Sequence, residues 1–155
     1  MLVSPSATIP QAWRALEVLA ALSYRSGELR DYLGEVARGV SELLGVDWSV
    51  VTLCRDGYDR VLASSIDIGE AADRAYALHG TVTGTVADTG QALVVEDSDA
   101  TPELGTVPAG YHAYLGVPLR ALDGRIIGTI CSFHRRPRNL DSAKCLQMSQ
   151  IFCAR

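Results

Sequence analysis

The sequence lacks a long apolar run and an excess of positive charge. No stretch approaches the roughly 20 consecutive apolar residues that span a bilayer, and residues 1–10 have neither a basic start nor the apolar segment of a secretory signal. The 14 basic residues are outnumbered by 18 acidic ones, which gives a net charge of −4 and leaves no broad positive field for phosphate backbones or anionic lipids. We therefore expect a cytoplasmic protein that binds no nucleic acid and does not insert into a membrane.

Cysteine is scarce, and its spacing is wide. The four cysteines are Cys54, Cys131, Cys145 and Cys153, with no Cys-x-x-Cys pair and no histidine at ligand spacing. Neither a disulfide framework nor a zinc site is expected, and no metal site is predicted. The motifs of serine hydrolases, zinc peptidases and P-loop proteins are also missing. No catalytic residue is assigned on this basis, and the chain is not expected to act as an enzyme.

The apolar residues are numerous enough for one core. Hydrophobic residues make up 48% of the 155 residues and charged residues 21%, the ordinary proportions of a folded domain. Apolar residues at helical spacing predict a helix over residues 9–23 and a second one over residues 29–44, which Gly45 terminates. We expect residues 1–24 to be a signalling and dimerisation helix and residues 25–155 to be the folded domain.

Hairpin signals dominate the middle of the chain. Segments of β-branched and aromatic residues bounded by turn residues predict strands over residues 48–53, 60–66, 92–95, 113–120 and 125–133. Short helices are predicted over residues 70–78 and 80–88. A last helix starts near Asn139 and reaches Arg155 without a stop signal, which favours a truncated helix. Helices that alternate with hairpins predict an α+β fold, in which a central antiparallel sheet is flanked by helices.

Two groups of short motifs resemble the GAF domain family. Residues 80–97, GTVTGTVADTGQALVVED, resemble the stretch in which a helix of the family ends at Thr-Gly, a short strand follows and an aspartate, here Asp97, opens the pocket loop. The closing hairpin and exit turn of the family resemble residues 114–119, 123–124, 127–131 and 137–138, in the same order. From about Leu29 onward the chain is therefore identified as a member of this family.

The resemblance implies a GAF/PAS-like sheet of about six antiparallel strands, with helices on one side and a ligand pocket on the other, roofed by short helices and loops. Members of the GAF family bind cyclic nucleotides, linear tetrapyrroles, haem, oxo-acids or no known ligand. The fold alone therefore does not identify the ligand. We expect a small-molecule-sensing regulatory domain of a bacterial signal-transduction protein, for example a sensor histidine kinase or a cyclic-dinucleotide enzyme.

The predicted pocket lies between one face of the sheet and its roof. Strand alternation places residues two apart on the same face, and the roof is formed by residues 80–88 with Asp97 and His112. The residues predicted to bind the ligand are Val50, Thr52, Asp97, His112, Tyr114, Thr129 and Cys131. An imidazole and a phenol would supply convergent polar groups in an apolar pocket, although His112 can also simply hydrogen-bond its loop.

Some ligands are disfavoured by the resemblance itself. Bilin-binding relatives have a cysteine immediately before the histidine, where this chain has Tyr111, so no covalent bilin is expected and the cofactor is unknown. The Asn-Lys-Phe-Asp-Glu signature of cyclic-nucleotide-binding relatives is missing too. Asp97, Asp99 and Glu103 could coordinate a cation or accept hydrogen bonds from a ligand amine, but acidic loops are more often merely solvated.

Two further functions stay open. In one, the domain binds no ligand and acts as a dimerisation and signal-relay module, with Trp13, Leu16 and Leu19 forming a parallel bundle with a second copy. In the other, it is a free methionine sulfoxide reductase-like enzyme that uses paired cysteines. Cys54 and Cys131 fall in neighbouring strands, but the cysteine pattern of those relatives is not reproduced. A homodimer through the terminal helices is expected in a sensing or a relay role.

Overall fold

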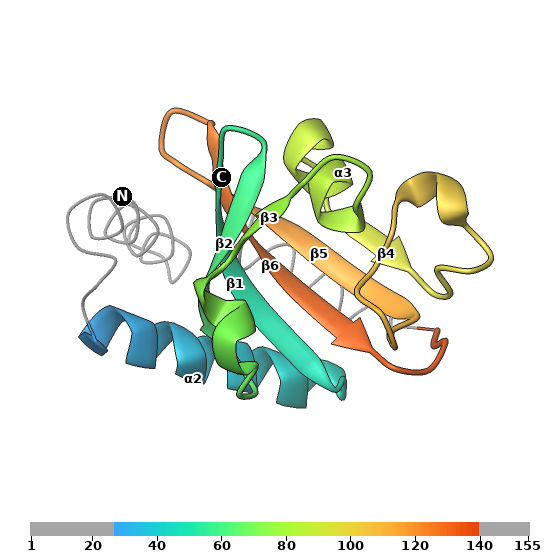
Figure 1. Ribbon diagram of the computed structural model, residues 1–155, viewed down its shortest axis with the longest axis horizontal. Coiled ribbons are helices and arrows are strands. Elements are labelled where there is room, and N and C mark those ends of the chain that lie inside the picture. The colour runs from blue at the N-terminus through green and yellow to red at the C-terminus, as the bar shows by residue number, and fades with distance from the viewer. Residues whose placement is uncertain (1–26, 140–155) are drawn as a thin grey trace, which may run out of the picture.

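The computed structural model describes residues 27–139 (Figure 1). Its elements, in chain order, are α2 (Gly27–Leu44), β1 (Trp48–Arg55), β2 (Tyr58–Ser64), the 3-10 helix η1 (Gly69–Asp73), β3 (Ala75–Ala77), α3 (Val82–Thr89), β4 (Leu93–Val95), the 3-10 helix η2 (Pro102–Leu104), β5 (Ala113–Arg120) and β6 (Ile126–His134). The helices expected over residues 9–23 and beyond Asn139 lie outside the described residues. Within the described range, no helix is long and apolar enough to cross a membrane.

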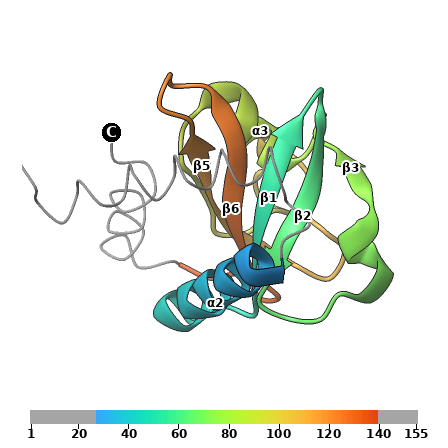
Figure 2. The ribbon, with the colours of Figure 1, turned by 90° about the vertical axis from the view of Figure 1, so that its left-hand side faces the viewer.

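The strands form one six-stranded sheet with the order β3-β2-β1-β6-β5-β4. Every neighbouring pair is antiparallel, and β1 and β6 lie side by side at the centre. α2 packs on one face of the sheet, whereas α3 and the loop that carries η2 lie on the other (Figure 1 and Figure 2). The predicted α+β fold, a central antiparallel sheet flanked by helices, is confirmed.

α2 is amphipathic, and its apolar side covers one face of the sheet. Leu29, Leu33, Val40 and Leu44 recur at helical spacing and are buried against the strands. Each such side chain stabilises the fold by about 1.5–3 kcal/mol when it is fully removed from water. Gly45, in the left-handed region at φ 67°, ends the helix as predicted.

Serine hydroxyls complete the contact between α2 and the sheet. Ser41 Oγ donates to Ser49 Oγ at 2.7 Å, and the Ser49 amide donates to Ser65 Oγ at 2.8 Å. The hydroxyl oxygens of Ser49 and Ser132 are 2.8 Å apart. Because Ser49 and Ser132 are buried, these bonds satisfy polar groups whose desolvation would otherwise cost free energy.

Local interactions cap both ends of α3. Thr81 Oγ1 accepts a hydrogen bond from the Gly84 amide at 3.0 Å, and Gly90 terminates the helix in left-handed backbone. Gly84 is also required by packing, because a Cβ there would lie 2.0 Å from the Leu78 carbonyl oxygen. The prediction of a short helix over residues 80–88 is confirmed to within the usual uncertainty of helix ends.

The segment between β2 and α3 differs from the prediction. The sequence predicts a helix over residues 70–78, whereas the structure has η1 followed by the strand β3. β3 pairs with β2, and Tyr76 lies opposite Asp59. The alanines of this segment favour a helix locally, but helix propensity is a weak preference that pairing along a sheet edge overrides.

Candidate functional site

The face of the sheet beneath α3 carries most of the residues predicted to bind a ligand. In the central pair of strands, Val50 lies opposite Cys131 and Thr52 lies opposite Thr129. Alternate residues of a strand point to opposite faces, so these residues share the α3 face, and Tyr114 joins them from β5. α3 covers them with apolar side chains. The structure therefore brings this part of the predicted site together.

A chain of polar side chains runs through the middle of this face. The hydroxyl oxygens of Thr52 and Thr129 are 2.7 Å apart, and Thr129 Oγ1 lies 3.2 Å from Cys131 Sγ. The same sulfur is 3.1 Å from Tyr114 Oη and 3.6 Å from Thr83 Oγ1. All of these residues are buried. We refer to Thr52, Thr83, Tyr114, Thr129 and Cys131 as the polar network. Buried polar groups cost free energy unless they have partners, and here each has one.

Asp59 adds a carboxyl group to the same face. It lies opposite Cys54 of β1, and Cys54 points to the α3 face because it is two residues beyond Thr52. Burial raises the pKa of the Asp59 carboxyl to about 6. Burial also raises the pKa values of the Tyr114 phenol and the Cys131 thiol, and the charge of Asp59 raises both further. The carboxyl is thus electrostatically linked to the polar network.

The two thiols on this face are held in their protonated form. Burial raises the pKa of Cys54 to about 12, against the lowering effect of a hydrogen bond with Thr52. Burial likewise raises the pKa of Cys131. Nucleophilic cysteines have lowered pKa values, so neither thiol has the surroundings of a reactive cysteine.

Cys54 and Cys131 do not form a pair. Cys131 lies opposite Val50, and Cys54 stands about 13 Å further along β1, at about 3.3 Å per residue. A disulfide needs Cα atoms within about 7 Å of each other. Although the two cysteines fall in neighbouring strands, as the sequence indicates, they are too far apart to be joined in this fold.

An aromatic cluster borders the polar network. The ring centroids of Trp48 and Phe133 are 4.7 Å apart, and those of Trp48 and Tyr111 are 5.4 Å apart. The guanidinium of Arg135 lies 5.0 Å from the centroid of the Tyr111 ring. Phe133 is buried, whereas Trp48 and Tyr111 are half-buried. The last two therefore present ring surface at the border of the site.

Asp97 and His112 contact each other just before the start of β5. His112 Nδ1 is 3.7 Å from Asp97 Oδ1 and 3.3 Å from Asp99 Oδ2. Cys131 lies opposite Gly116, which is about 13 Å along the strand from His112 at about 3.3 Å per residue. The predicted residues of β1 and β6 are therefore separated from His112 along the sheet, and Tyr114 lies between them.

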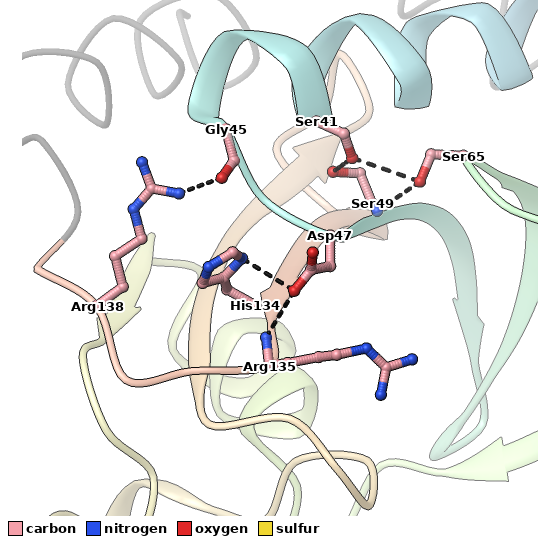
Figure 3. A network of polar contacts seen from close by, with 8 residues as sticks. All are labelled: Ser41, Gly45, Asp47, Ser49, Ser65, His134, Arg135 and Arg138. Carbon is pink, nitrogen blue, oxygen red and sulfur yellow. Dashed lines mark hydrogen bonds and ion pairs between the residues drawn. The ribbon is translucent and has the colours of Figure 1, made fainter.

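The basic segment at the end of β6, residues 134–138, contacts the turn between α2 and β1 (Figure 3). His134 Nδ1 lies 3.1 Å from Asp47 Oδ2, and the Arg135 amide donates to the same oxygen at 3.0 Å. The Arg138 guanidinium donates to the Gly45 carbonyl oxygen. Nothing in the sequence links Asp47 to His134, because the pair depends on the antiparallel neighbourhood of β1 and β6.

A cleft of about 510 Å³ lies elsewhere, between α2 and the segment that follows β2. The side of the cleft formed by α2 carries charges of both signs, from Arg30, Asp31, Glu35 and Arg38. Neither the polar network nor His112 lines this cleft. It is therefore not the pocket that the sequence predicts.

Solved structures share this fold at low sequence identity. The free methionine-R-sulfoxide reductase of Neisseria meningitidis, solved in complex with its substrate, is 18% identical with a TM-score of 0.68, over 99% of this chain and 89% of that one. The type II enzyme of Thermoplasma acidophilum is 15% identical with a TM-score of 0.67, over 79% and 85%. The GAF domain of an Acinetobacter phosphoenolpyruvate-protein phosphotransferase is 18% identical with a TM-score of 0.65, over 96% and 90%. At these identities the likeness shows the fold alone.

The reductases correct one expectation drawn from the sequence. They are enzymes that have this fold. The prediction that the chain does not act as an enzyme is therefore overturned, because missing hydrolase and nucleotide-binding motifs say nothing about thiol-dependent reduction.

Sequence comparison gives the family directly. No curated protein matches the chain by sequence, but the family model of the GAF domain matches residues 28–155. That range contains the whole six-stranded sheet and, apart from Gly27, both described α-helices that pack on it. The chain therefore belongs to the GAF domain family.

Proposed function

We propose that this GAF domain binds a small polar molecule on the α3 face of its sheet and serves as a sensing domain in a bacterial signalling protein. The observation that carries the proposal is the polar network, a continuous set of buried hydroxyl, phenol and thiol groups beneath α3. Apolar side chains would fill this position without needing partners. Polar groups that converge within apolar surroundings are typical of ligand sites.

Asp59 indicates the chemistry of the ligand. Its carboxylate has lost part of its hydration, which is why burial raises its pKa to about 6. A ligand that donates hydrogen bonds, above all an ammonium group, would replace the missing water and stabilise the charge. We therefore expect a small molecule with a cationic or hydrogen-bond-donating group.

The contacts at the end of β6 support a regulatory role. His134 and Arg138 join the end of this strand to the turn that follows α2 (Figure 3). A ligand that moves β6 relative to β1 would change these contacts and shift α2 against the sheet. Small shifts of helices at interfaces are a common way to transmit a binding event.

Ligand binding is tested by thermal shift and native mass spectrometry on the 155-residue chain. The probes are the free amino acids, methionine sulfoxide and the cyclic nucleotides. We expect an amine-bearing probe to raise the Tm and to add its mass. Asp59→Asn is expected to weaken its binding by about 10-fold or more, whereas Asp88→Asn, a change at an exposed position of α3, is the matched control. The proposal fails if no probe binds, or if Asp59→Asn binds the probe as tightly as the wild type.

Methionine sulfoxide also tests the reductase alternative. Consumption of this compound with dithiothreitol as the reductant would place the chain with the reductases. Cys54 and Cys131 lack the surroundings of a reactive pair. Any turnover is therefore also measured in Cys145→Ser and Cys153→Ser, two single variants at positions outside the described residues. A loss of turnover in either variant would show that the reaction depends on that cysteine.

A further inference from the structure

Asp97, Asp99 and His112 bring potential metal ligands to one point, in the segment between β4 and β5. One ligand atom from each residue lies within 4.8 Å of the others. We propose that these residues bind a divalent transition-metal ion, and we call them the Asp–Asp–His triad. Glu103, which the sequence groups with the two aspartates, lies on η2 and does not belong to the triad.

The separations between the ligand atoms fit a single ion. Two atoms that are each about 2.1 Å from a metal lie about 3.0 Å apart at a right angle and about 3.4 Å apart at a tetrahedral angle. His112 Nδ1 is 3.3 Å from Asp99 Oδ2 and 3.7 Å from Asp97 Oδ1. The distance to Asp99 Oδ2 falls within this range, and the distance to Asp97 Oδ1 exceeds it by a few tenths of an ångström.

The imidazole nitrogen that faces the aspartates has no hydrogen bond. His112 Nδ1 has less than 1 Å² of accessible surface and no hydrogen-bond partner, although carboxylates lie beside it. His112 Nδ1 lies within 4 Å of both carboxylates, and a metal ion between them would give this nitrogen a ligand bond. The imidazole makes the triad more than an acidic loop.

The backbone holds the triad in place without the metal. The amide of Ser98, between the two aspartates, donates to the His112 carbonyl oxygen at 2.8 Å, and the His112 amide donates to the His134 carbonyl oxygen at 2.9 Å. The Asp97 carbonyl oxygen accepts from the Ala100 amide at 3.1 Å. His112 is thereby fixed to both its loop and β6. A preorganised site loses little conformational entropy when it binds.

The mixed ligand set selects the class of ion. Imidazole nitrogen suits Mn²⁺, Fe²⁺, Co²⁺ and Zn²⁺, whereas Ca²⁺ and Mg²⁺ prefer oxygen ligands alone. Two carboxylates offset the two positive charges of the ion. The side chains of His112 and Asp99 are 36% and 79% exposed, so solvent reaches the triad and can supply the remaining ligands as water or a small anion.

The triad shares no residue with the polar network, whose nearest member in the chain, Tyr114, follows His112 by two residues. A metal ion at the triad therefore requires no ligand beneath α3, and the two proposals fail or succeed separately.

Mn²⁺ binding to the whole chain tests the triad. Titration followed by the electron paramagnetic resonance signal of free Mn²⁺ is expected to show one bound ion per chain, which Zn²⁺ displaces. His112→Gln and Asp99→Asn are each expected to weaken Mn²⁺ binding by at least about 10-fold. His79→Gln and Asp88→Asn change exposed residues away from the triad and are expected to bind Mn²⁺ as the wild type does.

Measurements on the variants distinguish a specific metal site from nonspecific metal binding and from unfolding of the variant protein. Asp99 has a side chain that is 79% exposed, so Asp99→Asn is expected to keep the wild-type Tm in the absence of metal. Weakened binding in both triad variants, with unchanged controls, supports the inference. A wild type that binds no Mn²⁺ at millimolar concentration, or Mn²⁺ binding that survives His112→Gln, overturns it.

Discussion

One carboxyl group, Asp59, makes the stability of the domain depend on pH. Burial raises its pKa from 3.8 to about 6. Above about pH 6 the carboxyl is ionised in the folded and the unfolded chain, and the folded state bears the full cost of desolvation. Below about pH 4 it is protonated in both states, and this cost disappears. Because the folded-state pKa is the higher one, the contribution of Asp59 to stability improves as the pH falls through this window.

Asp59→Asn is expected to remove this dependence. At pH 7 the variant should have the higher Tm, by a few degrees at most, because the side chain is only partly buried and solvent screens its charge. The difference in Tm should shrink toward zero as the pH falls from about 6 to about 4. Calorimetry of both proteins across this range measures it, with Asp88→Asn as the control. A Tm difference that does not change with pH would contradict the role given to burial.

At the scale of elements, a glycine in a helix and a glycine in a strand differ in the space available for a side chain. A Cβ at Gly39 of α2 would meet nothing within 4 Å, whereas a Cβ at Gly128 of β6 would lie 2.1 Å from the Thr52 carbonyl oxygen. Gly39→Ala is expected to stabilise the fold by about 0.5–1 kcal/mol, because glycine is costly inside a helix. Gly128→Ala is expected to destabilise it by about 2 kcal/mol or more, because β1 and β6 must separate.

Urea unfolding of the two variants measures both effects. The free energy of unfolding should rise for Gly39→Ala and fall for Gly128→Ala relative to the wild type. A destabilised Gly39→Ala would mean that another segment packs closely on this side of α2. A neutral Gly128→Ala would mean that the central strands are less tightly paired than the register indicates.

Elements can be predicted from the sequence where local interactions stabilise them. α2 is revealed by its apolar spacing and by Gly45, and the β5–β6 hairpin by Asp123-Gly124, because periodicity and turn chemistry act within a few residues. β3 is not revealed, since its strand conformation depends on pairing with β2. Its own residues carry no pattern that separates an edge strand from a short helix.

The same distinction, between local interactions and contacts of distant segments, applies to the residues of the candidate site. Strand alternation is enough to place the predicted residues of β1 and β6 on one face. Asp59 is not found from the sequence, because a charged residue in a strand suggests a solvent-facing position, and only the pairing with Cys54 places it on the α3 face. The approach of His112 to Asp99 depends on the path of the loop between β4 and β5, which the Ser98 hydrogen bond fixes. No spacing in the sequence indicates it.

At the scale of the whole molecule, α2 has an apolar side that the sheet does not cover. Tyr32 is 58% exposed and Leu43 is 37% exposed. They lie about three turns apart on nearly the same side of the helix. The sequence adds a second apolar stripe, with Trp13 and Leu16, on the helix predicted over residues 9–23, which lies outside the described residues. Large exposed apolar patches are uncommon on monomers.

We therefore expect the chain to form a homodimer through its terminal helices. Sedimentation at tens of micromolar should show a dimer for the wild type and a monomer for the double variant Trp13→Glu with Leu16→Glu, because two buried charges would oppose an apolar interface. Leu122→Glu is the matched control, since Leu122 is 55% exposed in the turn between β5 and β6, and it should remain a dimer. A monomeric wild type, or a dimer that persists with both charges in place, would leave the terminal helices without a role in association. A dimer lost in the double variant alone would place the interface at the helix predicted over residues 9–23, because both substitutions lie in that segment.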